Sequence, residues 1–468
     1  MSSDWREVTL EEVTTLLGDG LHGTPNYDDS GDYYFINGRN LSEGKIILDE
    51  NTKRATEEEY LKHKKDLNDR TILVSINGTL GNIAFYNDEN VFLGKSACYF
   101  NVNDEVEKDF IYYVLKNDVF QNHIDREATG TTIKNVSLKT MRGFSFKLPP
   151  LETQEKIVSI LGSIDQKIYL NQQTNETLET MAQAIFKSWF VDFDPVRAKI
   201  EAKSAGRDPN RAAMAAIAGL DSFDEASKDR QDWDEIEAAL DQKLSNMTEE
   251  QRQQLSRTAK LFPDELVESD IGEVPKGWVV NGFDSLADLD NSSVSPSDYP
   301  EKLWKHHSFP AFDETKLPIE ELGKEIKSRK YLVQKNAVLV SKLNPRFERT
   351  WAPKIDDSDS NICSTEFMQF VPKEDGGRGY IYFLVRSLPF QQGIKQRVTG
   401  STGSRQRAKP KQVAKMEVLI PNTELRNFFS IYANNILAKI QNNIHENKEL
   451  ASLRDTLLPK LISGEVGV

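Results

Sequence analysis

Polar and basic loops are the parts of this sequence most able to do chemistry. The best candidate is the stretch from Gly400 to Arg407, which reads GSTGSRQR. Its glycines allow a close approach of the backbone to a ligand. Its arginines can reach guanine or phosphate, and its glutamine amide suits adenine. These residue types favour contact with nucleic acid, and a surface loop with solvated arginines is the alternative.

Four other loops carry similar residues. The stretch 129–135 is less basic, 75–82 and 341–346 follow apolar strands and could equally be hairpin turns, and 20–25 could equally be a structural turn. The candidate DNA-contacting residues of all five loops and their flanks are His22, Thr24, Ser75, Asn77, Thr79, Thr131, Thr132, Lys134, Ser341, Lys342, Arg346, Ser401, Thr402, Ser404, Arg405, Gln406, Arg407 and Lys409.

Motifs for catalysis are incomplete. Asn344-Pro345-Arg346-Phe347 resembles a methyltransferase motif, but arginine replaces the second proline and a glycine-rich nucleotide fingerprint is missing. The sequence before Gly94-Lys95-Ser96 lacks the leading glycine of a phosphate loop. The six histidines do not pair at metal-ligand spacing. We therefore expect a chain that is not an enzyme and holds neither a metal nor a cofactor.

Charge is unevenly distributed along the 468 residues. The net charge is −14, yet residues 221–270 hold 15 acidic and 6 basic residues, and 388–416 and 128–147 hold no carboxylate at all. An acidic protein can therefore still present two basic faces. We find neither a long apolar run nor a signal-peptide pattern, which predicts a cytoplasmic protein. Cys98 and Cys363 are expected to be buried thiols.

The sequence contains one long duplication, which must position these loops. Ile72–Ser75 matches Val338–Ser341, Phe110–Leu115 matches Tyr380–Val385, and Thr129–Thr132 matches Thr399–Thr402, with offsets between 266 and 273 residues. Each half has short β-rich runs, turns and one or two helices. The sequence predicts two similar α+β domains.

A long helical pattern follows each half. Apolar residues recur every three or four positions from Ile157 to Trp189 and from Phe429 to Leu461, which is typical of a coiled coil. Asn171 and Asn175 interrupt the first seam, and Asn443 and Asn447 interrupt the second. Either these are exposed positions on imperfect helices, or the helices pair antiparallel and the asparagines fix the register.

Four segments in order carry a family resemblance. They are Leu148–Ile157, Met181–Val196, Gly272–Trp278 and Leu453–Glu465, which together resemble the spacer regions and second-domain start of Type I restriction-modification specificity subunits. The resemblance implies two DNA target recognition domains on an antiparallel coiled coil with a pseudo-two-fold arrangement. It implies that two modification (methyltransferase) subunits, which bind S-adenosylmethionine, dock on the helices and that restriction subunits join them. An orphan or architectural DNA-binding protein of the same ancestry is the alternative.

The domain boundaries follow from these patterns. We predict recognition domains at 1–150 and 272–421, spacer helices at 151–200 and 422–468, and an acidic helical insertion at 201–271 with helices near 212–219 and 232–244. Aromatic and apolar residues near the helix ends could dock the partner subunits or pack against the neighbouring domains. They are Phe186, Trp189, Phe190, Phe193, Leu457, Leu458 and Leu461.

Overall fold

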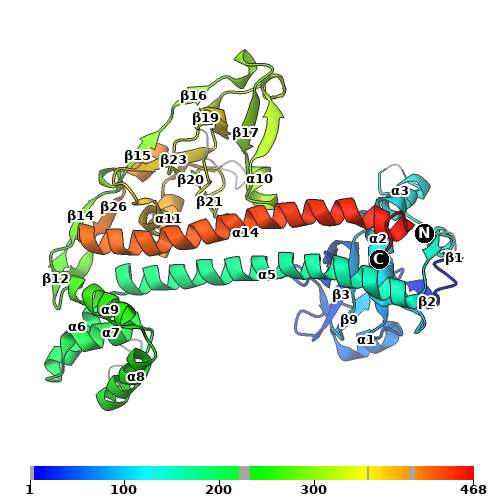
Figure 1. The fold of residues 1–468 in the computed structure, drawn as a ribbon, viewed down its shortest axis with the longest axis horizontal. Coiled ribbons are helices and arrows are strands. Elements are labelled where there is room, and N and C mark those ends of the chain that lie inside the picture. The colour runs from blue at the N-terminus through cyan, green and yellow to red at the C-terminus, as the bar shows by residue number, and fades with distance from the viewer. Residues whose placement is uncertain (1–4, 131, 221–231, 356–357, 400–405) are drawn as a thin grey trace. The chain divides into compact units, whose positions relative to one another are not determined.

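The fold is known from a computed structural model, which describes residues 5–130, 132–220, 232–355, 358–399 and 406–468. It divides into two compact units, each of which is described by itself below. The first unit comprises residues 1–169 and 448–468, and the second comprises residues 170–447. Two long helices, α5 (Leu151–Phe190) and α14 (Thr423–Ser463), contribute to both units (Figure 1).

The first unit is built on a four-stranded antiparallel sheet. Its strand β7 is buried along its whole length, as its apolar sequence requires. Ile72 and Val74 face a cluster that includes Phe110 of α2, whereas Leu73 faces a second cluster on the other side. The sheet order is β2 (Thr14–Asp19), β10 (Ala97–Val102), β7 (Thr71–Ser75) and β8 (Ile83–Phe85).

Smaller elements complete the first unit. The helices are α1 (Glu57–His63), α2 (Lys108–Lys116), α3 (Asp118–Glu127), α4 (Leu138–Arg142) and the short η1 (Gly38–Asn40). The small sheets are β1 (Arg6–Thr9) with β11 (Ser145–Leu148), β4 (Leu41–Ser42) with β5 (Lys45–Ile46), and β6 (Arg54–Ala55), β3 (Tyr33–Ile36) and β9 (Val91–Leu93).

The second unit repeats this plan, as the duplication predicts. Its four-stranded sheet has the order β15 (Ala287–Asp290), β23 (Phe367–Pro372), β20 (Val338–Ser341) and β21 (Thr350–Trp351). The matching helices are α11 (Arg378–Arg386), α12 (Leu388–Gln396) and α13 (Pro410–Ala414), and β14 (Val279–Gly282) pairs with β26 (Glu417–Ile420) as β1 pairs with β11. The predicted α+β class with two similar domains is confirmed.

The second unit differs in its side sheet, which has five strands among the described residues where the first unit has three. The order is β16 (Ser293–Val294), β19 (Lys330–Leu332), β22 (Asn361–Cys363), β17 (Leu303–His307) and β18 (Ile319–Leu322). The remaining elements are β12 (Leu266–Ser269), β13 (Gly272–Pro275), β24 (Val398–Thr399), β25 (Arg407–Ala408), α10 (Phe309–Glu314), η3 (Phe283–Ser285), η4 (Pro296–Asp298), η5 (Gly323–Glu325) and η6 (Ser358–Ser360).

The long helices run antiparallel, and asparagines lie in their seam. In the second unit, Asn171 Nδ2 donates to Asn447 Oδ1 at 2.9 Å, and Asn443 Nδ2 donates to Asn175 Oδ1 at 2.8 Å. Residue numbers therefore rise along one helix as they fall along the other (Figure 1). Asn171 and Asn443 are buried, and the bonds that their Nδ2 atoms donate to asparagines of the opposite helix favour one register.

A salt bridge joins the same two helices in the first unit. Asp165 Oδ1 accepts from Arg454 Nη1 at 2.7 Å and Asp165 Oδ2 accepts from the Tyr113 hydroxyl at 2.9 Å, which ties α2 to the helix pair. Burial, together with the Asp165 carboxylate, raises the pKa of Tyr113. Tyr113 is therefore a neutral hydroxyl that donates to the carboxylate.

Helices also fill the acidic segment that precedes the second domain. Four helices lie in the described part of this segment: α6 (Asp194–Ser204), α7 (Pro209–Ile217), α8 (Trp233–Ser245) and α9 (Glu249–Leu261). The last three pack in one apolar cluster that includes Met214, Ile236 and Leu240, and α6 contacts α7. The two expected helical stretches are thus helices, whereas the domain boundaries drawn around them stay predictions.

Two general properties complete the description. None of the helices in the described ranges is long and apolar enough to cross a membrane. Cys98 and Cys363 are buried free thiols as expected, and burial raises the pKa of both.

Candidate nucleic-acid interface

In the first unit, the strand ends bring three loops to one edge of the four-stranded sheet. Asp19 ends β2 and pairs with Cys98, Ala97 begins β10 and pairs with Ser75, and Ser75 ends β7. The loops after β2, between β7 and β8, and before β10 therefore all leave from the same edge. We name loops 20–25, 76–82, 94–96, 129–130 and 132–135 of the first unit reading edge 1.

Backbone and side-chain hydrogen bonds hold the loops of reading edge 1 together. The Gly78 amide donates to the Lys134 carbonyl at 3.0 Å, and Asn77 Nδ2 donates to Asn135 Oδ1 at 3.0 Å. The Leu21 amide donates to the Leu93 carbonyl at 2.6 Å, and the Lys95 amide returns a bond of 2.9 Å to the Leu21 carbonyl. Segments far apart in sequence thus form one connected surface.

Most of the candidates on reading edge 1 reach solvent. His22, Thr24, Thr79, Thr132 and Lys134 are exposed, and Asn77 is half-buried. His22 Nε2 lies 2.6 Å from Asp19 Oδ2, and Lys134 forms an ion pair with Asp125.

Ser75 is a correction to the candidate set. It is fully buried, and its hydroxyl accepts the amide of Asn82 at 2.9 Å. It therefore closes the β7–β8 turn and cannot reach DNA. A serine at the end of a strand can face inward as easily as outward, and the sequence alone did not separate the two.

The second unit presents the corresponding edge. Ser341 ends β20 opposite Phe367, which begins β23, and Thr350 of β21 pairs with Val340. The Asn344 amide donates to the Gln406 carbonyl at 2.9 Å, and the Ala408 amide donates to the Lys342 carbonyl at 2.8 Å. We name loops 342–349, 364–366 and 406–409 reading edge 2.

The candidates on reading edge 2 divide in the same way. Arg346, Arg407 and Lys409 are exposed, while Lys342 and Gln406 are half-buried. Ser341 is buried and its hydroxyl donates to the Leu343 carbonyl at 2.8 Å, so it too is a structural residue and not a DNA contact. The candidates Thr131, Ser401, Thr402, Ser404 and Arg405 lie outside the described residues.

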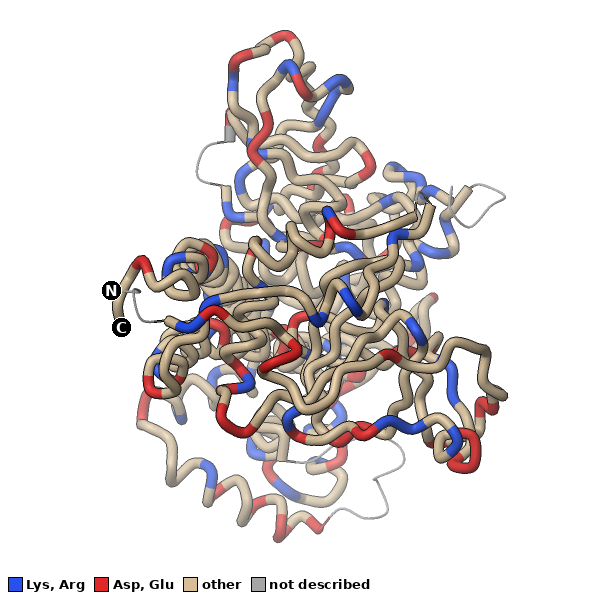
Figure 2. The backbone as a smooth tube through the Cα atoms, turned by 90° about the vertical axis from the view of Figure 1, so that its right-hand side faces the viewer, with Lys and Arg blue, Asp and Glu red and all other residues tan. Residues whose placement is uncertain are grey.

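Cations on both edges are paired with carboxylates. Arg407 Nε lies 3.0 Å from Glu366 Oε2, and the hydrogen bond to Glu366 raises the pKa of Arg407. Arg349 Nε and Nη2 bond the two oxygens of Asp313 at 2.7 and 2.8 Å. Over much of the chain, lysines and arginines are interspersed with aspartates and glutamates (Figure 2). The expected basic faces are therefore better described as small sets of cations, several of them in ion pairs.

Two exposed residues of these edges were missed by the sequence reasoning. Lys95 lies in the loop before β10 and bonds the backbone of the His22 loop, although its motif suggested only a failed phosphate loop. Phe347 follows Arg346 and is 52% exposed. The duplication could have pointed to both residues, because it places loops that follow matching strands at the corresponding edge of each sheet.

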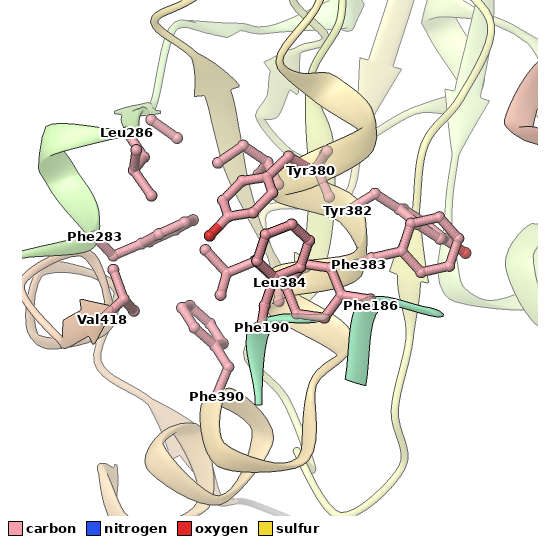
Figure 3. Packing of buried hydrophobic residues seen from close by; sticks show 14 of the residues in the cluster. Phe186, Phe190, Phe283, Leu286, Tyr380, Tyr382, Phe383, Leu384, Phe390 and Val418 are labelled. Carbon is pink, nitrogen blue, oxygen red and sulfur yellow. The ribbon is translucent and has the colours of Figure 1, made fainter. Parts of the chain in front are cut away.

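The residues expected to dock partner subunits lie mostly in the interior. Phe186, Trp189 and Phe190 are 1%, 6% and 8% exposed and pack on Phe429 of the second unit. Phe186 and Phe190 also pack on Tyr380 (Figure 3). Leu458 and Leu461 are buried in the core of the first unit. These five stabilise the chain itself, so an exposed docking surface is corrected to core packing. Phe193 and Leu457 are half-buried and stay candidates.

Comparison with known proteins agrees with the fold. Residues 2–180 match the family described as "Type I restriction modification DNA specificity domain". The chain is 29% identical over 354 residues, 73% of each chain, to the Type I restriction enzyme HindI specificity subunit of Haemophilus influenzae. It is 24% identical over 199 residues, 42% of this chain and 45% of the relative, to the MjaIX specificity subunit of Methanocaldococcus jannaschii.

A solved structure shares the fold. The Type I restriction-modification S subunit from M. genitalium superposes with a TM-score of 0.53 at 17% identity and covers 98% of this chain and 96% of its own. The fold is that of two α+β units, each with a loop-bearing sheet edge and a share of two long antiparallel helices. The chain is similar to the Type I restriction-modification specificity subunits, through the family match of residues 2–180 and over 73% of the HindI specificity subunit.

Proposed function

We propose that this chain is the DNA sequence-recognition subunit of a Type I restriction-modification complex and that each unit reads one half of a two-part target. This proposal rests on one observation: each unit has its own four-stranded sheet, and each gathers polar and cationic loops at the corresponding edge of that sheet. A duplicated reading surface is what a two-part target requires. An architectural DNA-binding protein would not need two such edges with different residues.

The exposed side chains divide the work of binding. Arg346, Arg407, Lys409, Lys134 and Lys95 supply cations that hold phosphates and thereby give affinity. Base readout falls to the remaining polar side chains, such as Thr79, Thr132 and Gln406, and to those arginines that reach guanine. The different residues on the two edges imply two different half-sites.

The long helices are proposed to set the distance between the half-sites. Helix α5 has 40 residues, which corresponds to a length of about 60 Å at 1.5 Å per residue. The same helices would dock modification subunits. We expect two of them because the chain is duplicated, and restriction subunits would join this assembly. Phe193 and Leu457 are the remaining docking candidates on this chain. We assign methylation, S-adenosylmethionine binding and cleavage to those partners, and no catalysis to this chain.

Methylation mapping tests the proposal. We would express the chain with its modification subunit in a host without other methyltransferases and sequence the genome with detection of methylated bases. The expected result is one two-part motif with a fixed unread gap, absent from a host that carries the modification subunit alone. DNA binding without any methylation would favour the architectural alternative. Methylation of the same motif without this chain would refute the proposal.

A further inference from the structure

An aromatic ring stands among the cations of reading edge 2. Phe347 is 52% exposed, and the guanidinium carbon of Arg346 lies 4.7 Å from the centre of its ring. The guanidinium carbon of Arg349 lies 5.9 Å from the same centre. Single exposed apolar residues are common on protein surfaces. Phe347 differs because it lies in a loop of the proposed DNA-binding edge and beside two cations.

The loop that carries Phe347 is held in place. The Phe347 amide donates to the Asn344 carbonyl at 2.9 Å, and the Asn344 amide donates to the Gln406 carbonyl at 2.9 Å. Arg349 is fixed by both carboxylate oxygens of Asp313 and lies 5.0 Å from the ring of Phe309. A side chain that is already positioned loses little conformational entropy when it binds.

We propose that Phe347 reads the 5-methyl group of a thymine in the major groove of the half-site bound by the second unit. This inference rests on the proposed function. The thymine methyl is the apolar group that base edges present in that groove, and phenylalanine is a side chain that contacts it. Burying one methyl group against the ring accounts for about a fourfold gain in affinity.

The position of Arg346 favours this mode over insertion of the ring between base pairs. An intercalating side chain needs free ring faces, and Arg346 stacks over the ring of Phe347. Phe347 is 52% exposed, which leaves ring surface for a methyl group, and the stacked guanidinium can reach a neighbouring phosphate or guanine. The corresponding loop of the first unit, 76–82, has no aromatic residue. This readout therefore belongs to the second unit alone.

Thymine-to-uracil exchange tests the inference because it removes only the methyl group. The complex of the full chain with its modification subunit is titrated with duplexes of the mapped target in which each thymine is replaced in turn by uracil. Wild type is compared with Phe347→Ala. Tyr299→Ala is the matched control, because Tyr299 is a 54% exposed aromatic residue beside Trp304 and outside both edges.

One exchange is expected to weaken wild-type and Tyr299→Ala binding about fourfold and to leave Phe347→Ala binding unchanged. Three results would overturn the inference: a target without thymine in either half-site, equal sensitivity of wild type and Phe347→Ala to every exchange, or unstacking of a base step reported by 2-aminopurine fluorescence. If no methylated target exists, the proposed function itself fails, and this outcome is distinct from the other three.

Discussion

The asparagine layer between α5 and α14 gives a measurable test of how the helix register is fixed. Asn443 is 1% exposed and donates to Asn175 Oδ1 at 2.8 Å. We predict that Asn443→Leu lowers the free energy of unfolding by about 2 kcal/mol, because it removes this bond and leaves the Asn175 oxygen without its donor. The free energy of unfolding of the double variant Asn175→Leu/Asn443→Leu should lie within about 1 kcal/mol of the wild-type value, since removal of both partners leaves neither amide unpaired.

A double-mutant cycle measures the coupling directly. Denaturant unfolding of wild type, the two single variants and the double variant should give a coupling energy of about 1–2 kcal/mol. Asn442→Leu is the matched control, because Asn442 is the exposed neighbour on the same helix and its change should alter stability by less than about 0.5 kcal/mol. If the two single costs simply add, the amides do not act as a pair and the register argument is refuted.

Three further predictions concern length, charge and pH. Insertion of seven residues into each long helix, after Tyr169 and after Asn447, keeps the 3.5-residue repeat and lengthens both helices by about 10 Å. Methylation mapping should then show an unread gap that is about 3 base pairs longer. An unchanged gap would show that the helices do not set the gap length. Arg407→Ala should weaken DNA binding and reduce the slope of log affinity against log salt by about 0.9 if Arg407 contacts one phosphate, whereas an unchanged slope would exclude that contact. Burial lowers the pKa of His307 to about 4 from an ordinary 6.5, so that as pH falls the unfolded chain binds a proton at this imidazole before the folded chain does, and the free energy of unfolding should drop between pH 6.5 and 4 by up to about 3 kcal/mol. Denaturant unfolding of His307→Gln at several pH values should lack this drop. If His307→Gln loses stability with falling pH as steeply as wild type, His307 is not the source of the drop.

The general fold could be predicted because it depends on patterns that repeat. The match between Ile72–Ser75 and Val338–Ser341 indicated two similar domains, and the two strands indeed occupy the same place in the two sheets. The 3.5-residue repeat predicted both long helices. The five-stranded side sheet could not be predicted, because its two extra strands, β16 and β19, are short, polar in part and without a counterpart among the described strands of the first unit's side sheet.

The site could be predicted only to the level of loops. Three of the candidate loops, 20–25, 75–82 and 341–346, lie at strand ends. Within them, Ser75 and Ser341 are buried and bond the backbone, while Thr79 and Arg346 are exposed. Serine, threonine and asparagine serve turns and ligands with the same hydrogen bonds, so residue type does not separate the two roles. Burial separates them, and burial depends on packing between segments far apart in sequence.

Packing also explains the aromatic residues at the end of α5. From the sequence, Phe186, Trp189 and Phe190 suit a docking surface as well as a core, because both are apolar. In the structure they fill the space between α5, α11 and α14 of the second unit. A spacer helix must be anchored to its recognition domain before it can hold that domain in place, and these rings provide the anchor.

The pairing of edge cations with carboxylates is consistent with an acidic chain that must discriminate between DNA sequences. Arg407 with Glu366 and Lys134 with Asp125 are already in ion pairs. A phosphate or guanine that binds either cation has to displace the paired carboxylate. This displacement offsets part of the electrostatic binding free energy that is common to all DNA sequences. Contacts made only with the correct bases then account for a larger share of the binding free energy. The ion pairs of the two edges are therefore expected to favour selectivity over affinity.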